Sequence, residues 1–571
     1  MDAAFIQELC KGIQTPTLSR RFSDATVGIM LIFGIQLLVV PTQIVLDLHS
    51  VNLPASILTM FFALITMSIA GFFNKDTGRF YHEYLQGPTD FLGRHMSFGF
   101  VAFFVLLIQD HIDNSSDIPS ITGVFVVTTI ISYVASFVLA FGGFRIEQQL
   151  RRSKQLANDI ESNNKSWPSP SIAWPAPSSE PLPKRISQLS ALSKAFSARE
   201  PLMETAPITS NSTAASINFA IQTAPIWIWL SLLVVVGIPV YLALGYMMPS
   251  DVFALGLFWV LSIQFQRSLR SPDTLSRSCR LKHFLFILAN PVLTTWALAT
   301  AYMWAKALYT RRDIAAIIGE FRHYNSLTES IIHIMQDHDV RAHLGAGDLA
   351  GLLLDAGVTC LGFKMYEYRS ELWVSLGTVS FTCAALAPVN VFLNVIVGRG
   401  FGLRTKEAIA FAGRSATLAL GVPAIDNLGG STTLTSTVAI FGGVLFQMTG
   451  DQLFSLLCID HQTPKNVSTQ SPKVSIPKSD RFILNPTHAT KTTGTKGNKN
   501  CYRGIHDESR VVAAGITVGI NAAAMGTSYL IERDSRATAY SALSMIMFGA
   551  ATVVVTALPG AAEVIISLAS R

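Results

Sequence analysis

Three segments in the second half of this strongly apolar chain combine polar residues with glycines. They cover residues 348–368, 406–433 and 515–527. The second segment contains Gly413-Arg414-Ser415-Ala416-Thr417, and the third reads GITVGINAAAMGT. All three look too polar or too broken for ordinary membrane-spanning helices. They are therefore the first places to look for residues that bind a solute.

Arg414, with Ser415 and Thr417 close by, has the residue types that bind a carboxylate. A guanidinium group recognises a carboxylate through two parallel hydrogen bonds, and hydroxyl groups add shorter-range ones. Unpaired backbone groups are costly in lipid, so broken helices persist only where they are buried in protein or line a cavity. Transporters use such breaks to aim the positive end of a half-helix at an anion. We therefore predict a carboxylate site here, although Arg414 snorkelling to the headgroups is the alternative.

The other two segments supply further candidates. Asn521 lies in an otherwise apolar stretch, where an interhelical hydrogen bond and a ligand contact are equally consistent with the sequence. The adjacent alanines favour close helix packing. Ionisable residues within a membrane are functional candidates, but they can also mark the ends of a re-entrant segment. The predicted substrate-binding residues are Arg414, Ser415, Thr417, Asn521, Gly526, Thr527, Asp355 and Lys364.

The composition determines the class of protein that positions these residues. Half of the 571 residues are hydrophobic, 14% are charged, and the mean hydropathy is +0.40. Soluble domains carry about 25% charged residues. At roughly 20 apolar residues per span, we predict an all-α polytopic membrane protein of about 12 transmembrane helices, with discontinuous or re-entrant helices in the carboxy-terminal half. The net charge of +6 is small for this length and indicates no nucleic-acid partner.

Apolar runs and polar stretches divide the chain into regions. We predict an amino-terminal tail, a four-helix membrane domain, a disordered polar linker and a transport domain at residues 1–23, 24–148, 149–223 and 224–571. The transport domain contains a polar insert at 459–506 and an amphipathic segment at 313–338, expected to form a lid.

Lysine and arginine residues indicate the orientation. The connectors after the first and third predicted spans contain neither residue, whereas Lys11, Arg20 and Arg21 precede the first span, and the linker is rich in both. By the positive-inside rule, the amino terminus and the linker face the cytosol. The membrane is the plasma membrane or that of an organelle.

No motif favours an enzyme. Gly345-Ala346-Gly347-Asp348 has the spelling of intramembrane aspartyl proteases, but no earlier apolar span supplies the second aspartate that this chemistry needs. The six cysteines are scattered without a paired spacing. We therefore expect no catalytic residue, no metal and no cofactor.

Two groups of motifs resemble known families. GRSATLALGVPAIDNLGGSTTLT at 413–435, GITVGINAAAMGTSYLIERDSRATAYSALSM at 515–545 and Asn290-Pro291-Val292-Leu293 are similar to the LrgB/CidB family. LPASILTM at 53–60 and DFLGRHMSFGFV at 90–101 resemble the LrgA/CidA family. Such a fusion is the arrangement of the plastidial glycolate/glycerate translocators of plants. The polar inserts and the start of the chain favour a fungal-type member.

The resemblance implies a membrane transporter of small monocarboxylates. These are 2-hydroxy and 2-oxo acids such as glycolate, glycerate, lactate or pyruvate, moved by proton coupling or by exchange. The main alternative is a holin- or antiholin-like pore or regulator of membrane permeability, and a third is an interaction protein whose linker recruits cytosolic partners. The expected partners are a small anionic organic acid and the lipid bilayer, with a homo-oligomer left open.

One departure from the family pattern bears on coupling. Ala522 and Ala523 stand where the family usually has Ser-His. Losing the histidine removes a proton carrier or a substrate donor, so proton coupling in this chain is an open question.

Overall fold

The computed structural model describes residues 16–49, 54–74, 76–106, 117–165, 223–270, 289–322, 327–337, 343–457, 497–533 and 535–570. Within these ranges the chain forms helices and no strand. It divides into two compact units, one comprising residues 1–15 and 149–224 and the other residues 16–148 and 225–571. The second unit contains every residue discussed below.

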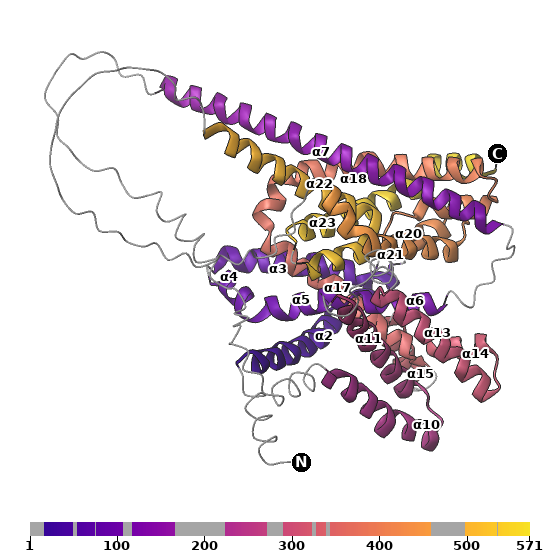
Figure 1. Ribbon diagram of the computed structural model, residues 1–571. Helices are drawn as coiled ribbons and strands as arrows, with labels where there is room; N and C mark the ends of the chain where they lie inside the picture. The colour runs from indigo at the N-terminus through magenta and orange to yellow at the C-terminus, as the bar shows by residue number, and fades with distance from the viewer. Residues whose placement is uncertain are drawn as a thin grey trace, which may run out of the picture. The chain divides into compact units, whose positions relative to one another are not determined.

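The amino-terminal helices of this unit end with one very long helix, α7. They are α2 (Pro16–Leu48), α3 (Ala55–Phe73), α4 (Thr77–Phe80), η1 (Tyr81–Leu85), α5 (Gln86–His95), α6 (Ser97–Leu106) and α7 (Ile118–Lys165) (Figure 1). Helix α2 begins inside the predicted tail, and α7 continues beyond the start of the predicted linker. The apolar run at 91–108, predicted as the third span, is interrupted at Met96, between α5 and α6.

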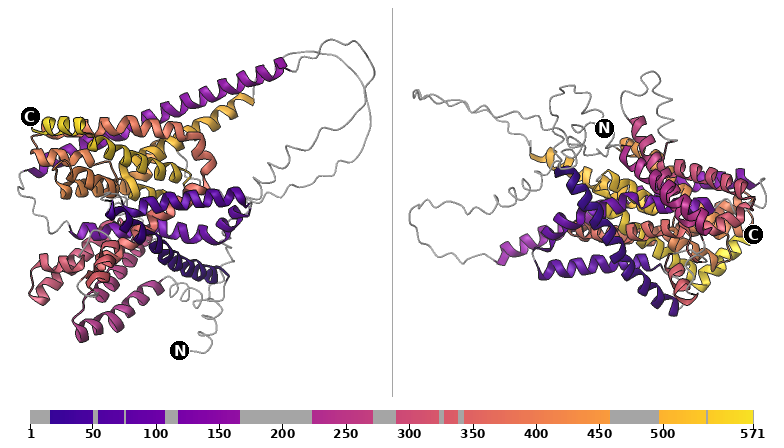
Figure 2. Two further views of the ribbon diagram at one scale, coloured as in Figure 1. Left: turned by 180° about the vertical axis from the view of Figure 1, so that it is seen from behind. Right: turned by 90° about the horizontal axis from the view of Figure 1, so that it is seen from below.

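The carboxy-terminal helices include several short pieces. They are η3 (Leu233–Gly237), α10 (Ile238–Leu244), α11 (Met248–Arg270), α13 (Pro291–Thr310), α14 (Ile314–Phe321), α15 (Leu327–Asp337), α17 (Ala346–Glu367), α18 (Arg369–Gly400), α19 (Thr405–Ala410), η4 (Phe411–Gly413), α20 (Leu418–Asp426), α21 (Thr432–Leu456), α22 (Gly497–Glu532), α23 (Ala537–Ala557) and α24 (Pro559–Ser570). Helices α22 and α23 pack side by side, and α18 packs against α23 (Figures 1 and 2).

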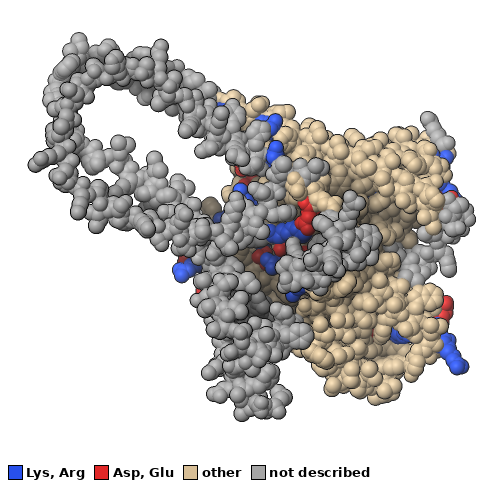
Figure 3. All heavy atoms as spheres, viewed as in Figure 1, with Lys and Arg blue, Asp and Glu red and all other residues tan. Residues whose placement is uncertain are grey.

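The described helices confirm a polytopic membrane protein. Nine of them are long and apolar enough to cross a bilayer. Large apolar side chains face outward, such as Phe72 at 85% exposure and Leu308 at 77%. Lys, Arg, Asp and Glu are sparse on the face shown in Figure 3. An outer surface of this kind suits contact with lipid, which cannot solvate charge.

Two of the three segments predicted to be broken are broken, and one is not. Residues 406–433 form α19, η4 and α20 joined by turns, and α22 is interrupted at Ala523. The prediction for residues 348–368 is wrong, because α17 is one continuous helix there. Its polar side chains are satisfied inside the protein: Asp348 Oδ2 accepts from the backbone N–H of Gly345 at 2.9 Å, and Lys364 forms ion pairs.

The amphipathic segment at 313–338 forms two helices, α14 and α15. In α14 the buried side chains are Ile317, Ile318 and Phe321, and the helix packs on α11, α13 and α17. The predicted insert at 459–506 lies outside the described residues up to position 496, and the predicted linker lies outside them from 166 to 222. The predicted domain boundaries remain predictions.

Helix α17 is the element on which the amino-terminal helices pack. It contacts α2, α3, α5 and α6 (Figures 1 and 2). Glycines on α17 allow the close approach: a Cβ on Gly362 would collide with the carbonyl oxygen of Met60, and one on Gly357 with the side chain of Met96. Thr59 and Thr359 add a buried hydrogen bond of 2.9 Å between α3 and α17. Small residues that let backbones meet are the usual way in which helices associate in lipid.

This packing predicts opposite outcomes for two glycines of the same helix. Gly362→Ala should force α3 away from α17 and cost about 1–3 kcal/mol, as overpacking does. Gly351→Ala is the matched control, because no atom lies within 4 Å of a Cβ placed there. The measurement is the thermal unfolding midpoint of the protein in detergent. Equal midpoints for the two variants would contradict the close approach of α3 to α17.

Candidate functional site

The two broken segments differ in how the backbone turns. After α19 the chain forms a single 3-10 turn, then a bend at Arg414 to Thr417, and resumes as α20. In α22 the helix is broken by a single residue, Ala523, with φ 46° and ψ −135°. A positive φ at a residue other than glycine costs about 1–3 kcal/mol and is concentrated at functional sites. Ala523 is thus both the point of the break and a point of strain.

Arg414 is a buried cation whose hydrogen-bonding capacity is partly unused. The residue is only 3% exposed, and its Nε and Nη1 atoms have no hydrogen-bond partner among the described residues. Its guanidinium lies 5.8 Å from the centre of the Phe125 ring. The hydroxyl of the neighbouring Ser415 is also buried without a partner. A guanidinium with unused donors beside an unused hydroxyl is the arrangement expected of an anion site.

Asn521 lies one turn before Met525 on α22 and contributes a second unused polar group. Its amide nitrogen donates to Ser136 Oγ and to the carbonyl of Thr517, both at 2.9 Å. Its side-chain oxygen is buried without a partner. The predicted interhelical hydrogen bond is therefore present, and an acceptor remains available for a hydroxyl group. The backbone oxygen of Asn521 and the Phe125 ring both lie within 4 Å of a Cβ built on Gly442 of α21.

Helix α7 provides polar residues that the sequence reasoning missed. Asn390 of α18 donates to Ser132 Oγ at 3.3 Å, and Ser136 receives the Asn521 bond. Asn394 donates to the carbonyl of Phe411 at 3.1 Å and so fixes the turn before Arg414. The four-residue spacing of Ser132 and Ser136 in an uncharged span places them on one helix face. That spacing is the feature of the sequence from which these two residues could have been predicted to face the protein interior.

The remaining predicted residues occupy different surroundings. Thr417 immediately precedes α20. Gly526 is packed so tightly that a Cβ built on it would lie 2.6 Å from the Cβ of Ala522. Thr527 is already bonded to Ser541 at 2.8 Å and to the carbonyl of Ala523 at 2.9 Å. Thus Arg414, Ser415 and Asn521 share one region, while Thr527 supports the break itself.

Asp355 and Lys364 contact the amino-terminal helices. Asp355 lies within hydrogen-bonding reach of Ser56. Lys364 forms ion pairs with Asp90 at 2.8 Å and with Glu367 at 3.0 Å. The Lys364–Asp90 ion pair connects α17 to α5. No described contact joins Asp355 or Lys364 to Arg414.

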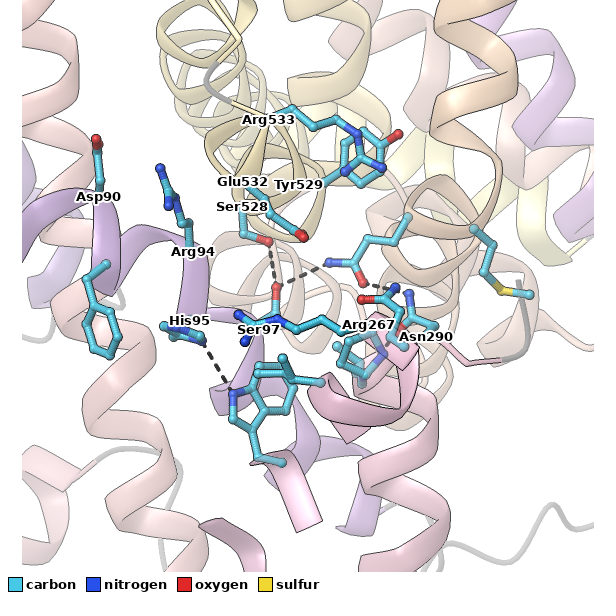
Figure 4. A pocket seen from close by; sticks show the side chains of 18 of the residues that line it. Asp90, Arg94, His95, Ser97, Arg267, Asn290, Ser528, Tyr529, Glu532 and Arg533 are labelled. Atoms are coloured by element: carbon cyan, nitrogen blue, oxygen red, sulfur yellow. Dashed lines mark hydrogen bonds between the residues drawn. The ribbon is translucent and has the colours of Figure 1, made fainter. Parts of the chain in front are cut away.

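A cavity of about 660 Å³ lies on the other side of the α22 break. Its polar wall is a chain of hydrogen bonds drawn in Figure 4: Ser97 to Ser528 at 2.5 Å, Gln447 to Ser97 at 3.2 Å, and Asn290 to Gln447 at 3.1 Å. Gln447 also donates to the carbonyl of Met525 at 3.2 Å. The wall therefore joins the interruption after α5 to the second half of α22.

The cavity and the Arg414 region are neighbours in the fold. Gln447, which lines the cavity, donates to the carbonyl of Met525, and Asn521 lies four residues before Met525 on α22. Gly443 of α21 lies against Met525, and Gly442 lies against Asn521. Along α22, the break at Ala523 thus lies between Asn521 and the residues that line the cavity.

Residues 275–469 and 503–560 match the model of the LrgB-like family. This part of the chain is an LrgB-like region. It contains Arg414, Asn521 and the break in α22. The match covers less than half of the chain and agrees with the resemblance of its motifs to the LrgB/CidB family.

Curated relatives of the LrgB-like region are distant. The chain is 23% identical over 111 residues to the "Holin-like protein CidB" of Staphylococcus aureus strains N315 and MW2. This stretch is 19% of the chain and 48% of each relative. The chain thus spans about half the length of the curated relatives it matches. No solved structure shows a significant match.

The strain at the break predicts an unusual glycine substitution. Ala523→Gly should stabilise the protein by roughly 1 kcal/mol, because glycine adopts a positive φ freely. Ala522→Gly should destabilise it by about 0.5–1 kcal/mol, since that residue keeps helical geometry. Thermal unfolding of both variants in detergent provides the comparison. Destabilisation of equal size in both would argue against the break at Ala523.

Proposed function

We propose that this protein carries small monocarboxylates across a membrane, with Arg414 as the group that binds the carboxylate. The single observation that supports this proposal best is the buried guanidinium with two unused nitrogen donors. A charge removed from water without a partner is strongly unfavourable. A transported anion would supply the missing partner each time it binds. No catalytic role is proposed for any residue.

The neighbouring groups favour a hydroxylated or oxo-substituted acid over a plain fatty acid. Ser415 offers an unused hydroxyl and Asn521 an unused amide oxygen. The Asn521 oxygen accepts a hydrogen bond, as a 2-hydroxyl group would require, and the Ser415 hydroxyl can donate to a 2-oxo group. Glycolate, glycerate, lactate and pyruvate meet these requirements. This agrees with the substrates expected from the resemblance to plant glycolate/glycerate translocators.

Alternating access would involve the broken helix. Broken helices at the substrate site are common in secondary transporters, where one bundle moves against another around a fixed site. Along α22, the break lies between Asn521 and the residues that line the cavity, so a shift of either half-helix would open or close a connection between them. Because Ala523 cannot carry a proton, we propose exchange of anions, or proton coupling through another group.

A second candidate function is a holin-like pore or regulator of permeability. One specific observation favours it: the similar proteins of Staphylococcus aureus bear the name "Holin-like protein CidB". A pore would pass solutes without saturation and without dependence on one buried arginine. The two proposals therefore differ in kinetics as well as in their sensitivity to Arg414.

Counterflow of labelled glycolate in proteoliposomes tests the carrier proposal. Saturable counterflow is expected, and Arg414→Ala should reduce it by roughly 10- to 100-fold, because hydrogen bonds to charged groups contribute about 1.5–3 kcal/mol. Arg404→Ala is the matched control, since Arg404 is paired with Asp117 in an exposed position. Imposing a pH gradient then shows whether protons are coupled.

The same vesicles separate carrier from pore. Leakage of a small trapped dye, unchanged by Arg414→Ala and accompanied by no counterflow, would favour the pore. Saturable counterflow that survives Arg414→Ala at full rate would leave a carrier but exclude Arg414 as its anion-binding group.

A further inference from the structure

The cavity beside the α22 break contains two arginines for which the described residues provide no ion-pair or hydrogen-bond partner. Arg94 of α5 and Arg267 of α11 both line it, and within the described part of the chain neither makes a hydrogen bond or an ion pair. Arg94 lies among the amino-terminal helices and Arg267 near the middle of the chain, so the fold brings together segments that are far apart in the sequence. Figure 4 shows Arg267 extending across the cavity toward Ser97.

The other charged residues of the cavity are mostly neutralised by partners. Asp90 is paired with Lys364 at 2.8 Å, and Arg533 is paired with Asp451 at 2.7 Å. Glu532 is the remaining carboxylate on the wall. Because Lys364 is shared with Glu367, the charges are better counted over the lining itself, where three arginines (Arg94, Arg267 and Arg533) face two carboxylates (Asp90 and Glu532) and leave one excess positive charge. A cavity lined by one sign of charge raises the local concentration of the opposite ion.

The polar wall of the cavity is a continuous network of hydrogen bonds between side chains. Ser97 and Ser528 are 4% and 2% exposed and bond to each other. Gln447 and Asn290 extend the chain of bonds, and Trp259 donates to His95 at 3.4 Å at its edge. These bonds hold the wall in one arrangement, and Gln447 ties it to the carbonyl of Met525. A volume of about 660 Å³ exceeds the needs of a small organic acid and leaves room for water.

We infer that this cavity is a second anion-binding site, a vestibule in which Arg94 and Arg267 hold a small carboxylate before it passes the α22 break. The amino-terminal helices thereby contribute directly to binding, through Arg94 and Ser97, and do more than support the LrgB-like region. The role as a waiting position rests on the proposed carrier function. The anion site itself does not.

The charge of the vestibule can be measured without transport. The reporter is Ile263→Cys, a cavity residue outside the hydrogen-bond chain, in the full-length chain with its six native cysteines replaced. Its rate of modification by the anionic reagent methanethiosulfonate ethylsulfonate is divided by the rate for the cationic trimethylammonium analogue. Joint substitution Arg94→Gln and Arg267→Gln should lower this ratio about tenfold, and glycolate should slow both reactions in the parent.

Two comparisons decide whether the effect is electrostatic. Arg94→Lys with Arg267→Lys should retain most of the parental ratio, because the charge is kept. Arg536→Gln should leave the ratio unchanged, since that arginine is paired with Glu371 away from the cavity. An unchanged ratio in the double glutamine variant, or an equal fall in the double lysine variant, would overturn the vestibule.

Transport kinetics then test the waiting position. In counterflow, the double glutamine variant should raise the half-saturating glycolate concentration about tenfold more than it lowers the maximal rate. A fall in the maximal rate alone would overturn the waiting position. Absence of counterflow in the parent protein would refute the carrier proposal, while the labelling ratio would still report on the anion site.

Discussion

A polar group that enters a bilayer must find its partner inside the protein, and the interior of this chain is arranged around that requirement. Lys364 meets Asp90 and Glu367, Asn390 meets Ser132, and Asn521 meets Ser136. Apart from the Lys364–Glu367 pair, which lies within α17, each of these contacts joins helices that are far apart in the sequence. Among the described residues, the Nε and Nη1 donors of Arg414 are exceptions to this requirement, as are the hydroxyl of Ser415 and the side-chain oxygen of Asn521.

The dependence of one half of the chain on the other follows from the same rule. Helix α17 belongs to the LrgB-like region, yet its glycines lie against Met60 and Met96 of the amino-terminal helices. Helix α7 supplies the serines that pair with Asn390 and Asn521. Without these helices, the polar groups of α17, α18 and α22 would face lipid. The amino-terminal helices therefore supply packing and hydrogen-bond partners that the LrgB-like region would otherwise lack in lipid.

Hydropathy and motif spacing predicted the class of fold and the two broken segments, because both signals are local in sequence. Length and apolar content identify a span without any knowledge of its neighbours. They failed for residues 348–368, where Asp355, Gly357 and Lys364 suggested a break, although α17 is continuous and Lys364 is satisfied by ion pairs. Pairing of this kind depends on which helices contact one another, and those contacts cannot be derived from a single sequence. The same limit hid the serines of α7 and the cavity beside Ser97.

The break at Ala523 connects these observations to movement. Neighbouring hydrogen bonds hold this strained backbone in place. Thr527 donates to the carbonyl of Ala523 and is bonded to Ser541, and Gln447 donates to the carbonyl of Met525. Gln447 also bonds Ser97, so a ligand that competes for Ser97 in the cavity would loosen the constraint on the second half of α22. Occupation of the cavity and the shape of the α22 break would then be energetically linked, as a carrier requires and a simple pore does not.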